Sequence, residues 1–284
     1  MAFLKFASFL LLLLLLLLFM AQGAVNAAGA SLSQSYHVIA GYDHVALSDD
    51  GQEIQLSLDA ASGSGFQSWR SYRSGVFNMQ IKVPGRNSAG VVTSFYLTSH
   101  GGRHDEVDFE FLGNREGKPI LLQTNVFADG VGNREERILL WFDPTADFHS
   151  YKVLWNNHQI VFYVDDIPIR VFKNNPAIGV PYLTEPMQIE ASLWDGDNWA
   201  TDKGLTKIDW SYAPFLAHYR GFDISGCVFR SQDCDSLAYW WNSQEHRSLD
   251  GQQEKQLDNV RKNFMYYDYC TDTSKHPVPP PECP

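Results

Sequence analysis

Acidic and apolar side chains alternate along residues 104–111, and this alternation strongly limits how the segment can fold. Glu106, Asp108 and Glu110 are interleaved with Val107, Phe109 and Phe111. Successive side chains of a β-strand point to opposite faces, so the segment predicts a strand with one acidic face and one apolar face. The apolar face requires a core behind it. Three like charges on the other face repel each other and contribute nothing to folding, which indicates that the chain uses them.

Strand-like segments of this kind continue from Tyr36 to Trp210. We predict strands at residues 53–58, 76–83, 91–97, 120–127, 137–142, 151–155, 159–164 and 187–193. Turn-forming pairs such as Pro84-Gly85 and Asn156-Asn157 separate them. Many short strands with regularly spaced turns are typical of a β-sandwich or barrel. The sequence therefore predicts an all-β fold.

The first 27 residues have the pattern of a secretory signal peptide. Lys5 precedes a leucine run at residues 10–18, and small residues follow. A membrane anchor is the alternative, but the apolar stretch at residues 6–20 is short for a span of about 20 residues. We predict cleavage after Ala27, with Gly23 as a second possibility, and a mature protein that is secreted and extracellular.

The net charge of −11 and the lack of basic clusters argue against nucleic acid as a partner. An acidic protein is also a poor binder of anionic polymers, which makes a neutral polymer the easier substrate. We predict no cofactor, no metal, and no membrane association once the signal peptide is removed.

The chain changes character near Trp210. All four cysteines lie beyond this point, at Cys227, Cys234, Cys270 and Cys283. An even number of cysteines in a secreted chain suggests disulfides. Of the three possible pairings we predict Cys227–Cys234 with Cys270–Cys283, which closes two short local loops.

The tail also contains one predicted helix, from Asp250 to Met265. Leu257, Val260 and Phe264 recur at helical spacing, and Asp250 can cap the first turn. We predict three parts: a signal peptide at residues 1–27, a catalytic β-sandwich at 28–215, and a disulfide-stapled extension at 216–284 that packs on the sandwich.

The acidic strand has the groups that glycosidic-bond cleavage needs. A retaining glycosidase holds two carboxyl groups about 5–5.5 Å apart. Residues four apart on a flat strand are separated by about 13 Å at their α-carbons, and two glutamates can close much of this gap by leaning toward each other. Our hypothesis is that Glu106 attacks the anomeric carbon, Glu110 acts as acid and base, and Asp108 orients Glu106. Spacing alone would also allow Glu106 and Glu110 to exchange roles.

Three close carboxylates cannot all stay ionised, so at least one pKa must rise. A raised pKa is what an acid catalyst requires. Two other interpretations remain open on the residues alone. The acids could form the charged face of an edge strand, or they could bind calcium.

The motif closely resembles the active-site signature of plant xyloglucan endotransglucosylase/hydrolases in glycoside hydrolase family 16. Further segments resemble this family in the expected order, at residues 63–68, 123–125, 132–135, 140–144, 168–170, 267–270 and 279–283. The resemblance covers the chain from about Tyr36 to its end. It implies a β-jelly-roll sandwich with a long cleft, and it implies Glu106 as nucleophile, Glu110 as acid/base and Asp108 as the assisting acid.

The resemblance also implies glucan contacts and the same two disulfides. The implied contact residues are Gln123, Thr124, Asn125, Asn133, Arg134, Glu135, Asn198, Trp199 and Lys275. From the residue types, Trp194 and Trp199 offer flat faces for pyranose rings, with core filling as the alternative, and we expect Trp199 to favour the cleft more. Arg134 could instead form a surface pair with Glu135 or Glu136.

The implied reaction cleaves the β-1,4-glucan backbone of xyloglucan and passes the held chain to another glucan or to water, in the plant cell wall and apoplast. Two alternatives are a β-glucan hydrolase of the same fold and a non-catalytic glycan-binding module. A non-catalytic binding module would be expected to lack Glu106 or Glu110, whereas both glutamates are present. The cysteine-bearing tail argues against a hydrolase that has the sandwich alone.

Several residues depart from the family pattern. Asp202 and Lys203 replace an arginine and a glycine, Lys275 replaces an arginine, and Asn259 replaces a tryptophan. Lysine keeps the charge but loses the bidentate fork of arginine. We expect these changes to cluster on the acceptor side of the cleft and to shift acceptor preference toward less branched glucans such as cellulose.

Overall fold

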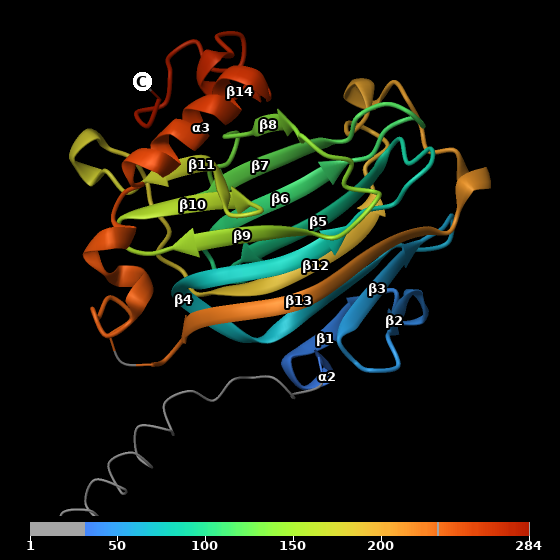
Figure 1. The fold of residues 1–284 in the computed structure, drawn as a ribbon, viewed down its shortest axis with the longest axis horizontal. Helices are drawn as coiled ribbons and strands as arrows, with labels where there is room; N and C mark the ends of the chain where they lie inside the picture. Colours follow the sequence, from blue (N-terminus) through green and yellow to red (C-terminus); the bar gives the residue numbers. More distant parts are fainter. Residues whose placement is uncertain (1–31, 232, 284) are drawn as a thin grey trace, which may run out of the picture. The chain divides into compact units, whose positions relative to one another are not determined.

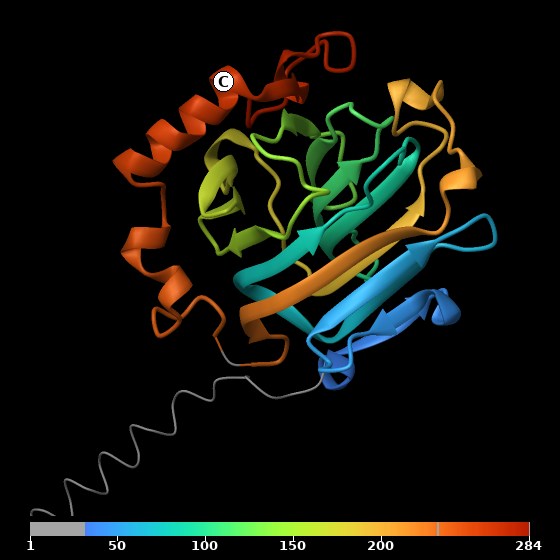
Figure 2. The same ribbon diagram turned by 45° about the vertical axis from the view of Figure 1, so that its right-hand side comes forward.

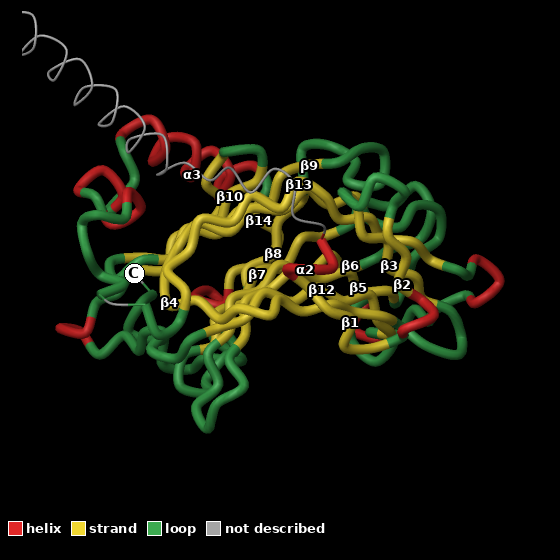
Figure 3. Tube along the Cα trace, turned by 90° about the horizontal axis from the view of Figure 1, so that it is seen from below, coloured by secondary structure: helices red, strands yellow, loops and turns green. Residues whose placement is uncertain are grey.

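Two layers of antiparallel strands share one long strand, β4 (Ser64–Lys82), in the computed structural model (Figures 1 and 3). The structure describes residues 32–231 and 233–283, so the predicted signal peptide and its cleavage sites lie outside the described residues. The first half of β4 pairs within one layer, and its second half pairs within the other. β4 thereby connects the two sheets of the sandwich.

The first sheet has the order β1-β4-β12-β5-β6-β7-β8-β14. Besides β4, its strands are β1 (Tyr36–Ala40), β12 (Met187–Asp195), β5 (Val91–Thr98), β6 (Glu106–Leu112), β7 (Leu121–Phe127), β8 (Glu136–Leu139) and β14 (Met265–Asp268). The second sheet has the order β2-β3-β13-β4-β9-β10-β11. Its remaining strands are β2 (Val45–Leu47), β3 (Glu53–Leu58), β13 (Phe215–Val228), β9 (His149–Trp155), β10 (Gln159–Val164) and β11 (Ile167–Lys173).

Aromatic side chains fill the space between the two sheets. Val107, Phe109 and Phe111 of β6 are buried there, as their alternation predicts. The ring of Phe109 meets Phe162 of β10 at 5.2 Å between centroids, and Phe111 meets Tyr151 of β9 at 4.7 Å, both edge to face. Burying each such ring contributes about 1.5–3 kcal/mol. The apolar face of β6 is thus held in the core, which presents its acidic face outward.

The predicted all-β sandwich is confirmed, with differences at particular strands. β3 matches the predicted residues 53–58, whereas β8 ends at Leu139 instead of continuing to residue 142. β13 was not predicted and lies between β3 and β4, so the sheet continues past Trp210. Its alternation is interrupted by a register shift at Gly221, where φ is +62°, and this interruption hides the strand from a period-two pattern.

The predicted helix and both disulfides of the tail are confirmed. α3 (Gly251–Asn263) begins after Asp250, whose carboxylate accepts from the backbone N–H groups of Gln252 and Gln253, each at 2.8 Å. Cys227 pairs with Cys234, and Cys270 pairs with Cys283. Figure 2 shows α3 and the last residues on the side of the sheets remote from β1–β3.

The other helical segments are short. They are α2 (Leu32–Ser35) and single turns of 3-10 helix at Tyr42–His44, Pro176–Ile178, Asp202–Gly204, Trp210–Tyr212, Trp240–Asn242, Gln244–His246 and Tyr269–Thr271. In the described ranges, no helix combines the length and apolar character needed to cross a membrane.

Candidate active site

The three carboxyl groups of β6 face a cleft across the first sheet. β6 is hydrogen-bonded on both sides, to β5 and to β7, so the edge-strand interpretation is wrong. The cleft has a volume of about 350 Å³. It is lined by Ser94, Tyr96, Glu106, Asp108, Glu110, Ser192 and Trp194. Within residues 32–231 and 233–283, no group of three or more His, Cys, Asp or Glu side chains has a metal-holding arrangement.

Asp108 is positioned to donate a hydrogen bond to Glu106. Burial, followed by the negative charges of Glu106 and Glu110, raises the pKa of Asp108 well above its usual value. A hydrogen bond between Asp108 and Glu106 raises it further. The raised pKa favours the protonated form of Asp108, which can donate this hydrogen bond to Glu106. Glu106 also lies 3.4 Å from Nε2 of His104.

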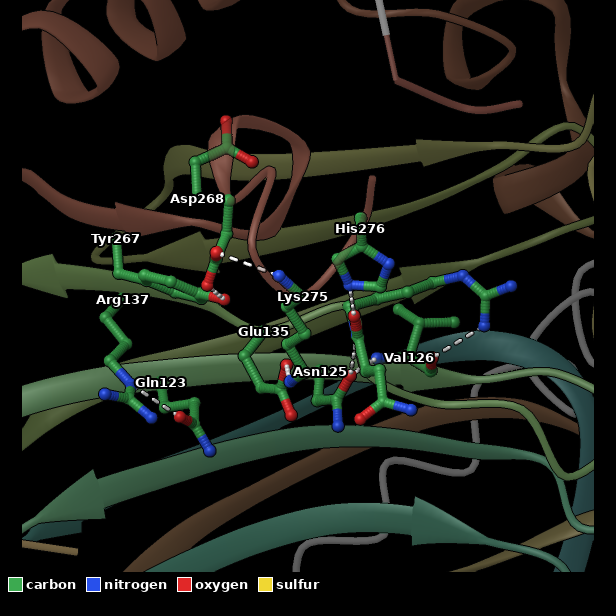
Figure 4. A network of polar contacts seen from close by, with 12 residues as sticks. Gln123, Asn125, Val126, Glu135, Arg137, Tyr267, Asp268, Lys275 and His276 are labelled. Carbon is green, nitrogen blue, oxygen red and sulfur yellow. Dashed lines mark hydrogen bonds and ion pairs between the residues drawn. The ribbon is translucent and has the colours of Figure 1, made fainter. Parts of the chain in front are cut away.

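Glu110 is bound by a short chain of side chains from β7 and β8. Nε2 of Gln123 donates to Oε2 of Glu110 at 2.6 Å, and Nε of Arg137 donates to Oε1 of Gln123 at 2.7 Å (Figure 4). Burial raises the pKa of Glu110 to about 7, although the hydrogen bond from Gln123 opposes the rise. This value suits a group that must give up a proton and regain it near neutral pH.

A second buried carboxylate, Glu190, lies on the same face of the sheet and was not found from the sequence. It is opposite Tyr96, which is opposite Asp108. Oε2 of Glu190 accepts from the Tyr96 hydroxyl at 2.7 Å, and Oε1 lies 2.8 Å from Nε2 of His100. The alternation of β12 (Glu190, Ser192 and Trp194) is the signal that could have indicated this polar face.

Gln123 and Asn125 lie on the cleft face of β7, but Thr124 does not. Gln123 is opposite Glu110 and Asn125 is opposite Asp108. Thr124 points to the other face, where its carbonyl and hydroxyl oxygens accept from Nη1 of Arg170 at 2.9 and 3.0 Å. The expected sugar contact from Thr124 is therefore wrong, because neighbouring residues of a strand cannot share one face.

Arg134 is buried, and its side chain binds the C-terminal extension. Its Nε lies 2.5 Å from Oε1 of Glu282, and its Nη1 donates to the carbonyl oxygens of Val126 and Val131. Its side chain is 6% exposed, as is that of Glu282. Arg134 thus pairs with Glu282 and not with Glu135 or Glu136 on the surface. Arg134 instead joins the turn before β8 to the last residues of the extension.

Replacement of Arg134 by methionine is expected to lower the free energy of unfolding by about 3–5 kcal/mol, because it leaves Glu282 buried without its partner. Denaturant unfolding measures this loss. The double variant Arg134→Met/Glu282→Gln also removes the unpaired carboxylate of Glu282 and should regain part of the stability. A variant with unchanged stability and a raised KM for glucan would instead support a sugar-binding Arg134.

Glu135 and Lys275 meet at the edge of the sheet beside Gln123 and Arg137 (Figure 4). Nζ of Lys275 lies 2.8 Å from Oε2 of Glu135. Asn133 adopts a left-handed backbone conformation with φ of +63°, and its carbonyl oxygen lies 3.0 Å from Nε2 of His276. The extension thus contributes a charged residue to this end of the sheet, as the resemblance implies.

Trp194 lies near the end of β12, and Trp199 lies in the loop that follows this strand. Trp194 lines the cleft with the carboxyl groups, while Trp199 packs beside it at 6.0 Å between ring centroids. Both are half-buried against a small apolar cluster around Val92 and Leu112. Asn198 is exposed in the same loop. The period of two along β12 brings Trp194 onto the acidic face, so Trp194 lies closer to the carboxyl groups, whereas the stronger preference of Trp199 for the sugar cleft remains a prediction.

The structure also shows the contacts of two residues that depart from the family pattern, Asp202 and Asn259. Asp202 forms an ion pair with Arg115 at 2.9 Å, which fastens the loop that carries Trp199. Asn259 lines a groove between α3 and the sandwich with Trp141, Ile167 and Phe264. This groove shares no lining residue with the carboxylate cleft. Asn259 therefore lies outside the part of the cleft that holds the carboxyl groups.

Comparison with known proteins shows strong similarity to one group. Residues 32–212 match glycosyl hydrolases family 16, and residues 235–283 match the xyloglucan endo-transglycosylase C-terminus. Xyloglucan endotransglucosylase/hydrolase protein 3 of Arabidopsis thaliana is 55% identical over 89% of this chain and 88% of its own length. Xyloglucan endotransglucosylase protein 2 of Diospyros kaki is 53% identical over 85% and 83%.

Solved structures show the same fold with lower sequence identity. The apo Crh5 transglycosylase has a TM-score of 0.56 at 25% identity, over 68% of this chain and 78% of that chain. The β-glucanase of Bacillus licheniformis has a TM-score of 0.54 at 25% identity, over 69% and 92%. Both similarities cover about two thirds of this chain.

Proposed function

The chain belongs to glycosyl hydrolases family 16 and, within it, to the xyloglucan endotransglucosylase/hydrolases, and from this we propose how its three acidic residues act on xyloglucan. The observation that carries the proposal is the pair of glutamates on one cleft-facing strand, with the buried Asp108 between them. The chain is an enzyme of xyloglucan transfer or hydrolysis. The alternatives of a glycan-binding module and of a different β-glucan hydrolase are not favoured.

Glu106 attacks the anomeric carbon of the β-1,4-glucan backbone and forms a covalent glycosyl-enzyme. Glu110 protonates the oxygen of the departing chain as the glycosidic bond breaks. Glu110, now ionised, then takes the proton from the hydroxyl of an incoming glucan or from water, which releases Glu106. Asp108 orients Glu106 through their hydrogen bond. Gln123 and Arg137 orient Glu110.

A labelled-acceptor assay tests the proposed reaction. The protein is incubated with xyloglucan and a fluorescent xyloglucan oligosaccharide, and polymer labelling and new reducing ends are measured separately. Labelled polymer indicates transfer, and new reducing ends without label indicate hydrolysis. The same assay with cello-oligosaccharides tests the proposed preference for less branched acceptors. Absence of both signals would contradict the function.

The rate should fall as the pH rises through about 7, because Glu110 has a pKa of about 7 and must be protonated to assist the leaving oxygen. The pH profile of kcat/KM measures this limb. Gln123→Leu removes the hydrogen bond that lowers the pKa of Glu110, so the limb should move to higher pH. A profile that stays unchanged in Gln123→Leu would assign the limb to another group.

We further propose that residues 1–27 are removed on secretion and that the mature protein acts in the cell wall and apoplast on neutral glucan chains. Residues 28–215 would then provide most of the sandwich and residues 216–284 the extension. β13 begins at Phe215 and pairs with β3, so the proposed extension supplies one strand of the second sheet.

A further inference from the structure

Trp69 is the most exposed tryptophan in the part of the chain that the structure describes. Its side chain is 60% exposed, compared with 50% for Trp240 and 36% for Trp210. It lies in β4 where the pairing with β12 is irregular: the five residues from Gln67 to Ser71 are opposite the three residues from Gln188 to Glu190. Such bulges occur often beside active sites, where they redirect a side chain.

Trp69 lies on the same side of the sheet as the carboxyl groups. Gln67 pairs with His37 of β1, and the Trp69 ring stacks on the His37 ring at 3.9 Å between centroids and 20° between planes. The neighbouring pair, Tyr36 and Phe66, packs edge to face in the core at the other side of these strands. His37, Gln67 and Trp69 therefore belong to the outer face that continues from the cleft.

A line of cleft-facing residues connects Trp69 with the catalytic strand. Asp108, Tyr96, Glu190 and Gln67 are opposite one another on four adjacent strands. At 4.7–4.9 Å between strands, Gln67 is about 14 Å from Asp108 across the sheet. A glucan chain that crosses the strands and passes the carboxyl groups would reach Trp69 several sugar rings away from the bond that is cut.

The surface between these points can bind hydroxyl groups. His100 is 55% exposed in its side chain and contacts both Gln67 and the buried carboxylate of Glu190. Glu190 also accepts from Gln67 and Tyr96. An exposed aromatic face beside oriented polar groups is the arrangement that fits a pyranose ring, which has apolar C–H faces and polar edges. If Trp69 served only to shield the His37 ring from solvent, it would not need to lie in line with the cleft.

We propose that Trp69, backed by His37, is a distal sugar-binding subsite that stacks a backbone pyranose of the donor glucan. This proposal rests on the function proposed above. The donor half is assigned because Lys275, on the expected acceptor side, pairs with Glu135 directly before β8. β8 and β14 form the end of the sheet opposite to β1 (Figure 1). Trp69 would make the enzyme favour long donor chains over short ones.

Donor length provides the test. Xyloglucan oligosaccharides of increasing backbone length serve as donors, with one fixed fluorescent acceptor, for wild type, Trp69→Ala and Trp69→Phe. For long donors, Trp69→Ala should raise KM about tenfold, equivalent to about 1.4 kcal/mol, with little change in kcat. For the shortest active donor, the KM of Trp69→Ala should equal that of wild type. Trp69→Phe keeps an aromatic face and should recover much of the affinity.

Trp240→Ala is the matched control, because Trp240 is also exposed but packs against Trp241 and His246 in the extension. It should leave the dependence on donor length unchanged. Equal KM values of wild type and Trp69→Ala for all donors would overturn the proposal, as would an equal loss for short and long donors or a dependence on acceptor length instead. Failure of the proposed function would be distinguishable, since wild type itself would then transfer no donor.

Discussion

Replacement of Glu106 by alanine is expected to abolish both transfer and hydrolysis. Without its carboxylate no glycosyl-enzyme can form, and the loss should be about 10⁴-fold or more, as when the nucleophile of another covalent enzyme is removed. The rate of polymer labelling and the rate of new reducing ends should fall together, because both reactions pass through the same intermediate. A change that affected only one of them would not fit a shared nucleophile.

The Glu106→Ala protein should remain folded. Removal of Glu106 takes a hydrogen-bond acceptor from Asp108 but also takes one negative charge from the cluster, so the thermal midpoint should change little. Glu116→Ala is the matched control, since Glu116 is exposed in the loop after β6, and it should keep full activity. Fragmentation of the labelled peptide by mass spectrometry, after reaction of wild type with a slowly released donor, should locate the adduct on Glu106 and not on Glu110.

The outcome that would contradict this assignment is equally direct. If the adduct is found on Glu110, or if Glu106→Ala keeps measurable turnover at the level of Glu116→Ala, Glu106 is not the nucleophile. An adduct on Glu110 would exchange the two roles, which spacing along the strand alone allows.

Replacement of Glu110 by glutamine is expected to give the second-largest loss, about 10²–10⁴-fold, which is the usual contribution of a positioned acid or base. Glutamine preserves the shape and can still contact Gln123, but it cannot transfer a proton. The fall in rate above about pH 7 should disappear with the group that has this pKa. The pH profile of kcat/KM in the variant measures this change.

A donor with a good leaving group can distinguish an acid catalyst from a residue that only positions the substrate. A donor with a good leaving group, such as a substituted phenol, departs without protonation, so Glu110→Gln should form the glycosyl-enzyme from it at a nearly normal rate. The intermediate should then accumulate, because the base that activates the acceptor is missing. A variant that is slow with natural and activated donors to the same extent would argue that Glu110 positions the substrate instead.

Local patterns in the sequence predicted the parts of the molecule that depend on nearby residues. The period of two at residues 106–111 predicted the strand and its two faces, and the burial of Val107, Phe109 and Phe111 confirms it. Asp250 predicted the start of α3, since a cap acts on the next three residues. The two disulfides were also predictable, because each closes a short loop.

The same alternation would have excluded Thr124, which lies between Gln123 and Asn125 and must face the core. The resemblance grouped the three residues as contacts, whereas parity along β7 separates them. The sequence alone thus contained enough information to correct one of its own predictions.

Only the tertiary structure decided which side chains meet across strands. The register of β6, β7 and β8 brings Gln123 and Arg137 to Glu110, and burial in that environment raises the pKa of Glu110. The pair of Arg134 and Glu282 joins residues 148 positions apart, and Glu190 meets Tyr96 across 94 positions. Alternation determines the face that a side chain occupies, but pairing register and long-range packing determine its neighbours, and the neighbours set its charge and its chemistry.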